Sequence, residues 1–309
     1  MNRKYVFGPI QSRRLGVSLG VDLVTAKTCP LDCIYCEARA TTNLTMERRE
    51  YVPVDEVIAE LQMTLAEIPA PDYITFSGAG EPTLNSRIGD VVDFVKSNYP
   101  QIKLCLLTNG VLLGDETLRR AISAADLVIP SLDASNEAEY RTINRPAAGS
   151  TLAGLVKDIA GFAREYTHRL VLEIFIVPGV NDSPASIARF AELVRYIAPD
   201  AVQLNTLDRP GVVPDLQAAP PETLAAFQVI LQDICEIEAV KPLQKSRQQN
   251  ISTELEGKLL DIIRHRRVDI AGLAGISGIP EAELRPILLR LEQRNLLVIA
   301  ADGFLSAVK

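Results

Sequence analysis

The chain has 309 residues, of which 47% are hydrophobic, and its net charge is −7. This length suits one large domain and one small one. No run reaches the roughly 18 apolar residues of a membrane span, and the N-terminus lacks a signal-peptide pattern. An odd count of five cysteines argues against a secreted disulfide framework. We therefore expect a cytoplasmic protein without membrane contact, and the acidic charge disfavours a surface that binds nucleic acid throughout.

Short apolar runs alternate with helical patterns over residues 1–239, which we expect to form the large domain. The runs predict strands at 17–24, 73–78, 103–110, 127–134, 170–179 and 201–208. Helical periodicity predicts helices at 54–68, 87–99, 115–125, 152–166, 184–197 and 221–234. Near-continuous apolar runs are typical of parallel strands. Six β/α units in series indicate an α/β fold, a (β/α)6 partial TIM barrel, with a doubly wound open sheet as the competing layout.

The polar stretch 240–252 interrupts this pattern and indicates a linker. Residues 253–309 then predict three helices and a β-hairpin around Ala301-Asp302-Gly303, the elements of a small winged-helix-like domain. Its third helix mixes Glu283, Arg285 and Arg290 and contains Pro286. A DNA-reading helix carries a clearer basic face, so we favour docking to a protein partner, or a lid on the barrel, over DNA binding.

Three thiols lie close together in CPLDCIYC, as Cys29, Cys33 and Cys36. A cubane iron–sulfur cluster is usually held by four thiolates, so three leave one iron with an open position. A structural zinc site needs four closed ligands. The remaining Cys105 and Cys235 fall in a strand pattern and a helix pattern. The three cysteines therefore favour an iron–sulfur cluster over zinc.

The C-x3-C-x2-C spacing with Tyr35 before the last cysteine resembles the signature of the radical S-adenosylmethionine (SAM) superfamily. SGAGEPTL (77–84) resembles the glycine-rich segment of that family. The resemblance implies a 4Fe–4S cluster on Cys29, Cys33 and Cys36, with SAM chelating the fourth iron. One electron then cleaves SAM to a 5′-deoxyadenosyl radical, which abstracts hydrogen from a substrate that the sequence leaves unidentified.

Over about residues 6–210 the chain further resembles the Fe–S oxidoreductase branch related to wyosine (tRNA imidazoguanosine) synthetases. The segments that carry this likeness are FGPIQSRRLGVSLGVDLVTAKTCPLDCIYCE, SGAGEPTLN, PSLDA with INRP after it, and VQLNTLDRP. The wyosine enzymes carry a second cluster on extra cysteines before the radical motif. No cysteine precedes Cys29 here, which argues against the tRNA chemistry.

Polar residues at the ends of the predicted strands complete the expected site, since barrel chemistry gathers at the carboxyl ends of strands. The resemblance implies cofactor contacts for Tyr35, Ser77, Gly78, Ala79, Gly80, Glu81, Pro82, Asn109, Ser131, Asp133, Glu173 and Asn205. Among these, Glu81 is expected to stabilise the SAM amine, and Ser131 and Asp133 are expected to contact the ribose hydroxyls. Candidates for catalytic residues are Arg145, Asp208 and Arg209, and Arg13 and Arg14 are weaker candidates for gripping a carboxylate or phosphate.

The implied electron donor is reduced flavodoxin or ferredoxin, and the substrate is an unknown small molecule, RNA or protein. Two alternatives stay open. One is a redox-sensing regulator that binds DNA according to its cluster state, and the other is an activase that installs a glycyl radical on a partner protein.

Overall fold

The computed structural model describes residues 3–12, 14–208, 211–238, 253–300 and 302–308. Its strands are β1 (Val6–Ser12), β2 (Gly16–Val21), β3 (Thr28–Cys29), β4 (Asn43–Leu44), β5 (Tyr73–Phe76), β6 (Lys103–Thr108), β7 (Leu127–Pro130), β8 (Arg169–Ile176), β9 (Ala201–Thr206), β10 (Glu236–Glu238), β11 (Leu297–Ile299) and β12 (Leu305–Ala307). Its helices are α1 (Val54–Glu67), α2 (Ile88–Asn98), α3 (Glu116–Ile122), α4 (Glu137–Ile143), α5 (Leu152–Glu165), α6 (Pro184–Ile197), α7 (Pro221–Leu231), α8 (Thr253–His265), α9 (Ile270–Ser277) and α10 (Glu281–Gln293).

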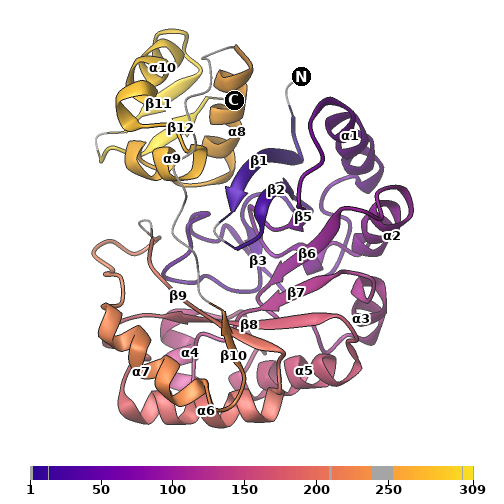
Figure 1. Cartoon of the computed structure of the whole chain (residues 1–309), viewed down its shortest axis with the longest axis vertical. Helices are drawn as coiled ribbons and strands as arrows, with labels where there is room; N and C mark the ends of the chain where they lie inside the picture. Colours follow the sequence, from indigo (N-terminus) through magenta and orange to yellow (C-terminus); the bar gives the residue numbers. More distant parts are fainter. Residues whose placement is uncertain (1–2, 13, 209–210, 239–252, 301, 309) are drawn as a thin grey trace.

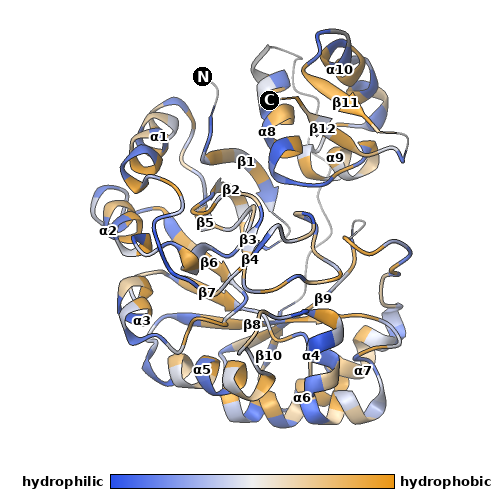
Figure 2. Ribbon diagram, turned by 180° about the vertical axis from the view of Figure 1, so that it is seen from behind, coloured by the Kyte–Doolittle hydropathy of each residue, from blue (hydrophilic) through white to orange (hydrophobic). Residues whose placement is uncertain are grey.

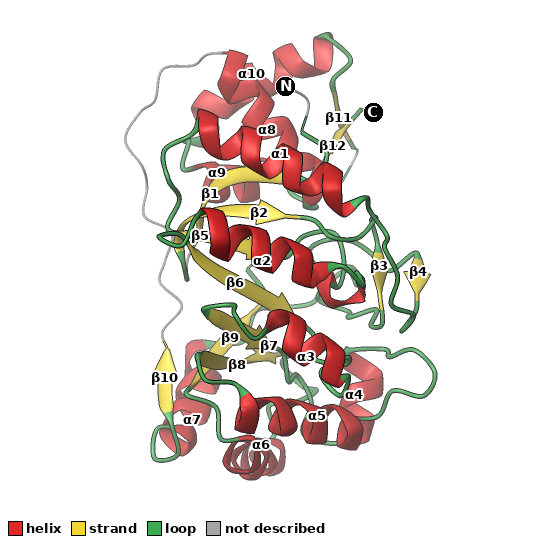
Figure 3. Ribbon diagram, turned by 90° about the vertical axis from the view of Figure 1, so that its right-hand side faces the viewer, coloured by secondary structure: helices red, strands yellow, loops and turns green. Residues whose placement is uncertain are grey.

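One curved sheet organises the first part of the chain. Its order among the described residues is β1-β2-β5-β6-β7-β8-β9-β10. Every pair is parallel except β1 with β2, which is antiparallel. The helices between the strands lie on its outer side (Figures 1 and 3). The strand order never reverses, so the doubly wound alternative is wrong and the predicted partial barrel is confirmed.

The core of the barrel lies between the sheet and the outer helices. Ile74, Leu104 and Leu172 on the strands are fully buried, as are Leu61 and Val91 on the facing helices. The helices carry both apolar and polar stripes (Figure 2), as expected for helices that cover a sheet with one face. Burial of each such side chain stabilises the folded state by about 1.5–3 kcal/mol. This packing fixes the strand ends from which the site is built.

Five elements of this part were missing from the sequence prediction. Two of them, β3 and β4, are only two residues long. β1 contains Gly8 and Pro9, and an edge strand tolerates a proline that a central strand does not. Asn136 caps the start of α4, and its side chain accepts a hydrogen bond from the backbone N–H of Glu139, a capping signal that the sequence did carry. β10 is only three residues long. The sequence predicted Cys235 on a helix, but α7 ends at Leu231. Cys235 lies half-buried in the turn before β10.

The last described elements are α8, α9 and α10 and an antiparallel pair of strands, β11 and β12. They have a core of their own that includes Leu259, Ile263 and Leu284, and Ile10 of β1 packs against it. Helices α8 and α9 lie against β1 (Figure 1). The predicted linker lies entirely outside the described residues, and the domain limits and the winged-helix class stay predictions. No helix in the described ranges is long and apolar enough to cross a membrane.

The loop after β5 passes very close to the chain before the cysteines. A Cβ atom at Gly80 would lie 2.0 Å from the carbonyl oxygen of Thr28 and 2.8 Å from Val24. We predict that Gly80→Ala lowers the free energy of unfolding of the metal-free protein by about 1–3 kcal/mol, because backbone must move. A Cβ at Gly161 in α5 meets nothing within 4 Å, so Gly161→Ala should raise stability by up to about 1 kcal/mol. Urea denaturation measures both, and equal stability of Gly80→Ala and wild type would contradict this account.

Candidate active site

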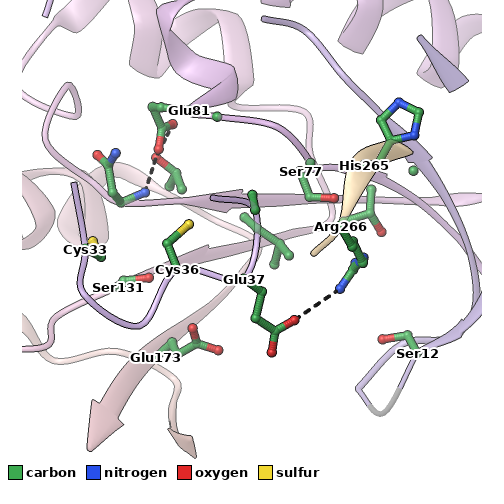
Figure 4. A pocket seen from close by; sticks show the side chains of 18 of the residues that line it. Ser12, Cys33, Cys36, Glu37, Ser77, Glu81, Ser131, Glu173, His265 and Arg266 are labelled. Carbon is green, nitrogen blue, oxygen red and sulfur yellow. Dashed lines mark hydrogen bonds and ion pairs between the residues drawn. The ribbon is translucent and has the colours of Figure 1, made fainter. Parts of the chain in front are cut away.

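A cavity of about 350 Å³ opens at the carboxyl ends of the barrel strands (Figure 4). Most of the residues that were predicted from sequence line it: Cys29, Cys33, Tyr35, Cys36, Ser77, Gly78, Gly80, Glu81, Asn109, Ser131, Glu173 and Asn205. They come from the cysteine loop and from the ends of β5 to β9, which lie far apart in the chain. The parallel sheet brings them together because all of its carboxyl ends face one side.

The cysteine loop is held in place by the chain that follows α4. The backbone N–H groups of Asp32 and Ile34 donate to the carbonyl oxygens of Asn144 and Ile143, at 2.9 Å each. Leu31 forms a β-bridge with Pro146. Because ordered backbone fixes the loop, the three thiols keep their places around the cavity.

Each of the three sulfur atoms faces one N–H donor. Lys27 Nζ lies 2.8 Å from Cys36 Sγ, Asn144 Nδ2 lies 3.3 Å from Cys33 Sγ, and Asn109 Nδ2 lies 3.5 Å from Cys29 Sγ. Burial opposes the charge of Lys27, but the charges of Cys36 and Cys29 outweigh it and raise the pKa of Lys27 above its usual value. Hydrogen-bond donors and a cation stabilise the negative charge of thiolates and cluster sulfides. Of these three donors, the sequence prediction included only Asn109.

The donor set fits a cubane better than a single ion. In the part of the chain that the structure describes, no three His, Cys, Asp or Glu side chains could hold one metal ion. The thiolates of a cubane each bind a different iron and stand further apart. Burial raises the pKa of Cys29 to about 12 and that of Cys33 well above its usual value. The free Cys29 and Cys33 thiols are therefore protonated at neutral pH, and metal binding to them would release protons.

Tyr35 and Asp133 form the support behind the cysteine loop. The Tyr35 hydroxyl donates to Asp133 Oδ2 at 2.5 Å, and its ring stacks on Phe175 with centroids 3.8 Å apart. The same carboxylate accepts from Asn144 Nδ2 at 2.7 Å and from the backbone N–H of Phe175 at 3.1 Å. Burial raises the pKa of Asp133 to about 6. Asp133 was expected to contact the ribose of SAM, but it does not line the cavity and instead positions Tyr35 and Asn144.

Glu81 ties the ends of β5 and β6 together. Its carboxylate accepts from the Thr83 backbone N–H and hydroxyl, the Thr108 hydroxyl and the Asn109 backbone N–H, at 2.6–3.1 Å. Three of these donors meet Oε1 and one meets Oε2, so Oε2 keeps an acceptor position open. Burial raises the pKa of Glu81. The hydrogen bonds to Oε1 support a positioning role, and the contact with the SAM amine that the sequence suggested stays a prediction. Its neighbours Ala79 and Pro82 are buried and do not line the cavity.

An ion pair lies on the inner wall of the barrel. Arg14 Nη1 is 2.5 Å from Glu173 Oε2, and both side chains are largely buried. Asn205 Nδ2 lies 3.4 Å from the same carboxylate oxygen. Arg14 comes from the turn between β1 and β2, outside the six β/α units, and its neighbour Arg13 lies outside the described residues. Both Arg14 and Glu173 line the cavity.

The three catalytic candidates are not part of this arrangement. Arg145 is exposed, 3.9 Å from Asp32, and does not line the cavity. Asp208 is exposed just beyond β9 and does not line it either. Arg209 is outside the described residues. The cavity offers Arg14 instead, and His265 and Arg266 of α8 and the segment after it, which the sequence did not suggest.

Comparisons with known proteins define the class. The family model "Radical SAM superfamily" matches residues 23–191, and the chain belongs to this superfamily, whose members are enzymes that bind a 4Fe–4S cluster and SAM. The predicted class and cofactors are thereby confirmed. A radical SAM methyltransferase from Sphaerobacter thermophilus has a similar fold, with a TM-score of 0.58 and 18% identity, over 74% of this chain and 67% of that one.

More particularly, the chain is similar to a group described as UPF0026. It is 30% identical to UPF0026 protein MJ1312 of Methanocaldococcus jannaschii, over 77% of this chain and 74% of that protein. It is 36% identical to a Brachyspira hyodysenteriae protein named "GTPase Obg", over 78% of this chain but only 35% of that protein. These relatives fit the Fe–S oxidoreductase branch, while the link to wyosine synthetases stays a prediction.

Lys27 gives a test of the sulfur environment. We predict that Lys27→Met lowers the midpoint potential of the reconstituted cluster on the order of 60 mV, about 1.4 kcal/mol for one electron. The reason is that a lost cation and hydrogen bond disfavour the more negative reduced state. Redox titration followed by electron paramagnetic resonance measures this shift. Lys157→Met, on the exposed face of α5, is the matched control, and equal potentials in the two variants would contradict the role of Lys27.

Proposed function

We propose that this chain is a radical SAM enzyme that cleaves SAM reductively and abstracts hydrogen from a substrate. One observation carries the proposal: three thiols with no fourth cysteine beside them share a cavity with the SGAGEP segment. Cys105, on β6, is fully buried and Cys235 lies before β10, and neither lines that cavity. One iron of a cluster held by Cys29, Cys33 and Cys36 is thus left for a ligand other than a cysteine of the described residues.

Cys29, Cys33 and Cys36 would hold the cluster, and the bound cluster would supply the one electron needed to cleave the S–C5′ bond of SAM into methionine and a 5′-deoxyadenosyl radical. The chain's own residues hold and orient the reactants. Ser77, Gly78 and Gly80 allow close approach of the methionyl end, because small residues leave their backbone groups accessible. Ser131, Glu173 and Asn205 face the cavity from β7 to β9, where the ribose and adenine are expected.

The partners of the reaction are proposals of the same kind. We expect reduced flavodoxin or ferredoxin as the electron donor, and a small molecule, RNA or protein as the substrate. Against sequence-specific DNA reading by α10, Arg285 pairs with Glu281 at 3.3 Å and Arg290 pairs with Glu256 at 3.5 Å. Both guanidinium groups already face carboxylates, so the helix offers little unbalanced positive charge to a phosphate backbone.

The test is formation of 5′-deoxyadenosine. We predict that anaerobically reconstituted protein converts SAM to 5′-deoxyadenosine and methionine when reduced with dithionite, and that Cys33→Ala abolishes this and lowers the iron content. Cys235→Ala, which removes a thiol far from the cavity, should behave as wild type. Liquid chromatography with mass spectrometry measures the product. Activity retained by Cys33→Ala, or none in wild type, would refute the proposed function. Deuterium transfer from candidate substrates into 5′-deoxyadenosine would then identify the substrate.

A further inference from the structure

The last part of the chain forms a wall of the cofactor cavity. His265 at the end of α8, Arg266 after it and Ile276 of α9 line the same cavity as the cysteines and Ser77 (Figure 4). Helices α8 and α9 reach it across β1, and Ile10 of β1 packs into their apolar core. The family model ends at residue 191, so this wall lies outside the matched part of the chain.

The His265 side chain contacts an aromatic ring, a carboxylate and a backbone carbonyl group. Its ring stacks on Phe7 with centroids 4.7 Å apart, and its side chain is only 9% exposed. Nε2 lies 2.8 Å from Asp22 Oδ2, and Nδ1 lies 2.7 Å from the carbonyl oxygen of Asp261. A carboxylate and a carbonyl oxygen can only accept, so both ring nitrogens donate and the ring is an imidazolium. Burial disfavours that charge, but Asp22 and Asp261 outweigh it and raise the pKa of His265.

Asp22 also contacts the SGAGEP segment. Its other oxygen, Oδ1, accepts a hydrogen bond of 2.7 Å from the backbone N–H of Ala79. A Cβ at Gly78 would lie 1.8 Å from the same oxygen, and Gly78 has a φ of +104°. Asp22 therefore lies directly against Gly78 and Ala79, the second and third residues of the segment. One carboxylate joins the imidazolium of α8 to the loop expected to carry the methionyl end of SAM.

The same end of α8 also contacts the cysteine loop. The backbone N–H of Arg267 donates to the carbonyl oxygen of Glu37 at 3.0 Å. Arg266 Nη1 lies 3.7 Å from Glu37 Oε2, the ion pair drawn in Figure 4. Glu37 directly follows Cys36. Residues 265–267 thus join the two loops on which the proposed cofactor site depends.

We propose that His265 is a positioning residue through which packing of α8 against the barrel and binding of SAM reinforce one another. The imidazolium holds Asp22, and Asp22 holds Gly78 and Ala79 in the conformation that receives SAM. Coupling of this kind is reciprocal, so SAM must stabilise the packing of α8 as much as that packing strengthens SAM binding. The inference rests on the proposed function, because it requires SAM to bind beside the SGAGEP segment.

The first experiment measures the SAM affinity of the reconstituted protein by equilibrium dialysis. We expect His265→Leu to weaken SAM binding about tenfold or more, within the usual range of such coupling, while its iron content stays that of wild type. His265→Gln keeps one N–H donor for Asp22 and should bind within a few-fold of wild type. His168→Leu removes the other histidine, which is exposed, and should change nothing. Equal SAM affinity in His265→Leu and wild type overturns the proposal.

The second experiment needs no variant. Hydrogen–deuterium exchange of wild-type protein should show slower exchange of α8 amides, several-fold, when SAM is added to the reconstituted protein. Unchanged exchange in α8 with SAM bound overturns the coupling even if His265→Leu folds poorly. Wild type that binds no SAM and forms no 5′-deoxyadenosine instead refutes the proposed function. Wild type that binds SAM while His265→Leu binds it equally well refutes the coupling alone.

Discussion

The number of thiolates around the cavity is the constraint on which the other features depend. Three cysteines within eight residues can hold three irons of a cubane, and the fourth must then find its ligand elsewhere. Backbone hydrogen bonds hold the cysteine loop against the end of α4 and the chain after it. Each sulfur also faces a side-chain N–H donor. A thiolate cluster carries negative charge, which Lys27 partly offsets from inside the protein.

The barrel supplies the geometry that this constraint demands. The parallel strands place the ends of β5 to β9 around the cavity, so that side chains more than a hundred residues apart meet there. Two additions to the barrel form further parts of the cavity wall. The β1–β2 turn contributes Arg14, and α8 contributes His265. Both lie outside the part that the family model matches.

Much of this was predictable from the sequence because it is encoded locally. The six predicted strands are short apolar runs. The three cysteines lie within eight residues and the SGAGEP segment is six residues long, so each can be recognised from its own short stretch of sequence. Contacts between distant residues were not predictable. Lys27 reads as an ordinary polar residue until its Nζ is seen beside Cys36 Sγ. The sequence assigned Asn144, in the INRP segment, no role at the cysteines. It predicted a ribose contact for Asp133, which in the structure accepts hydrogen bonds from Tyr35 and Asn144. His265 needed the docked position of α8, which no pattern in one chain reveals.

The open iron is tested most directly by electron paramagnetic resonance of the reduced, reconstituted protein with and without SAM. The account predicts a 4Fe–4S signal whose g values change when SAM is added, because a new ligand reaches one iron. An identical spectrum in the presence of saturating SAM, or a protein that holds a single zinc ion and no iron, would contradict it.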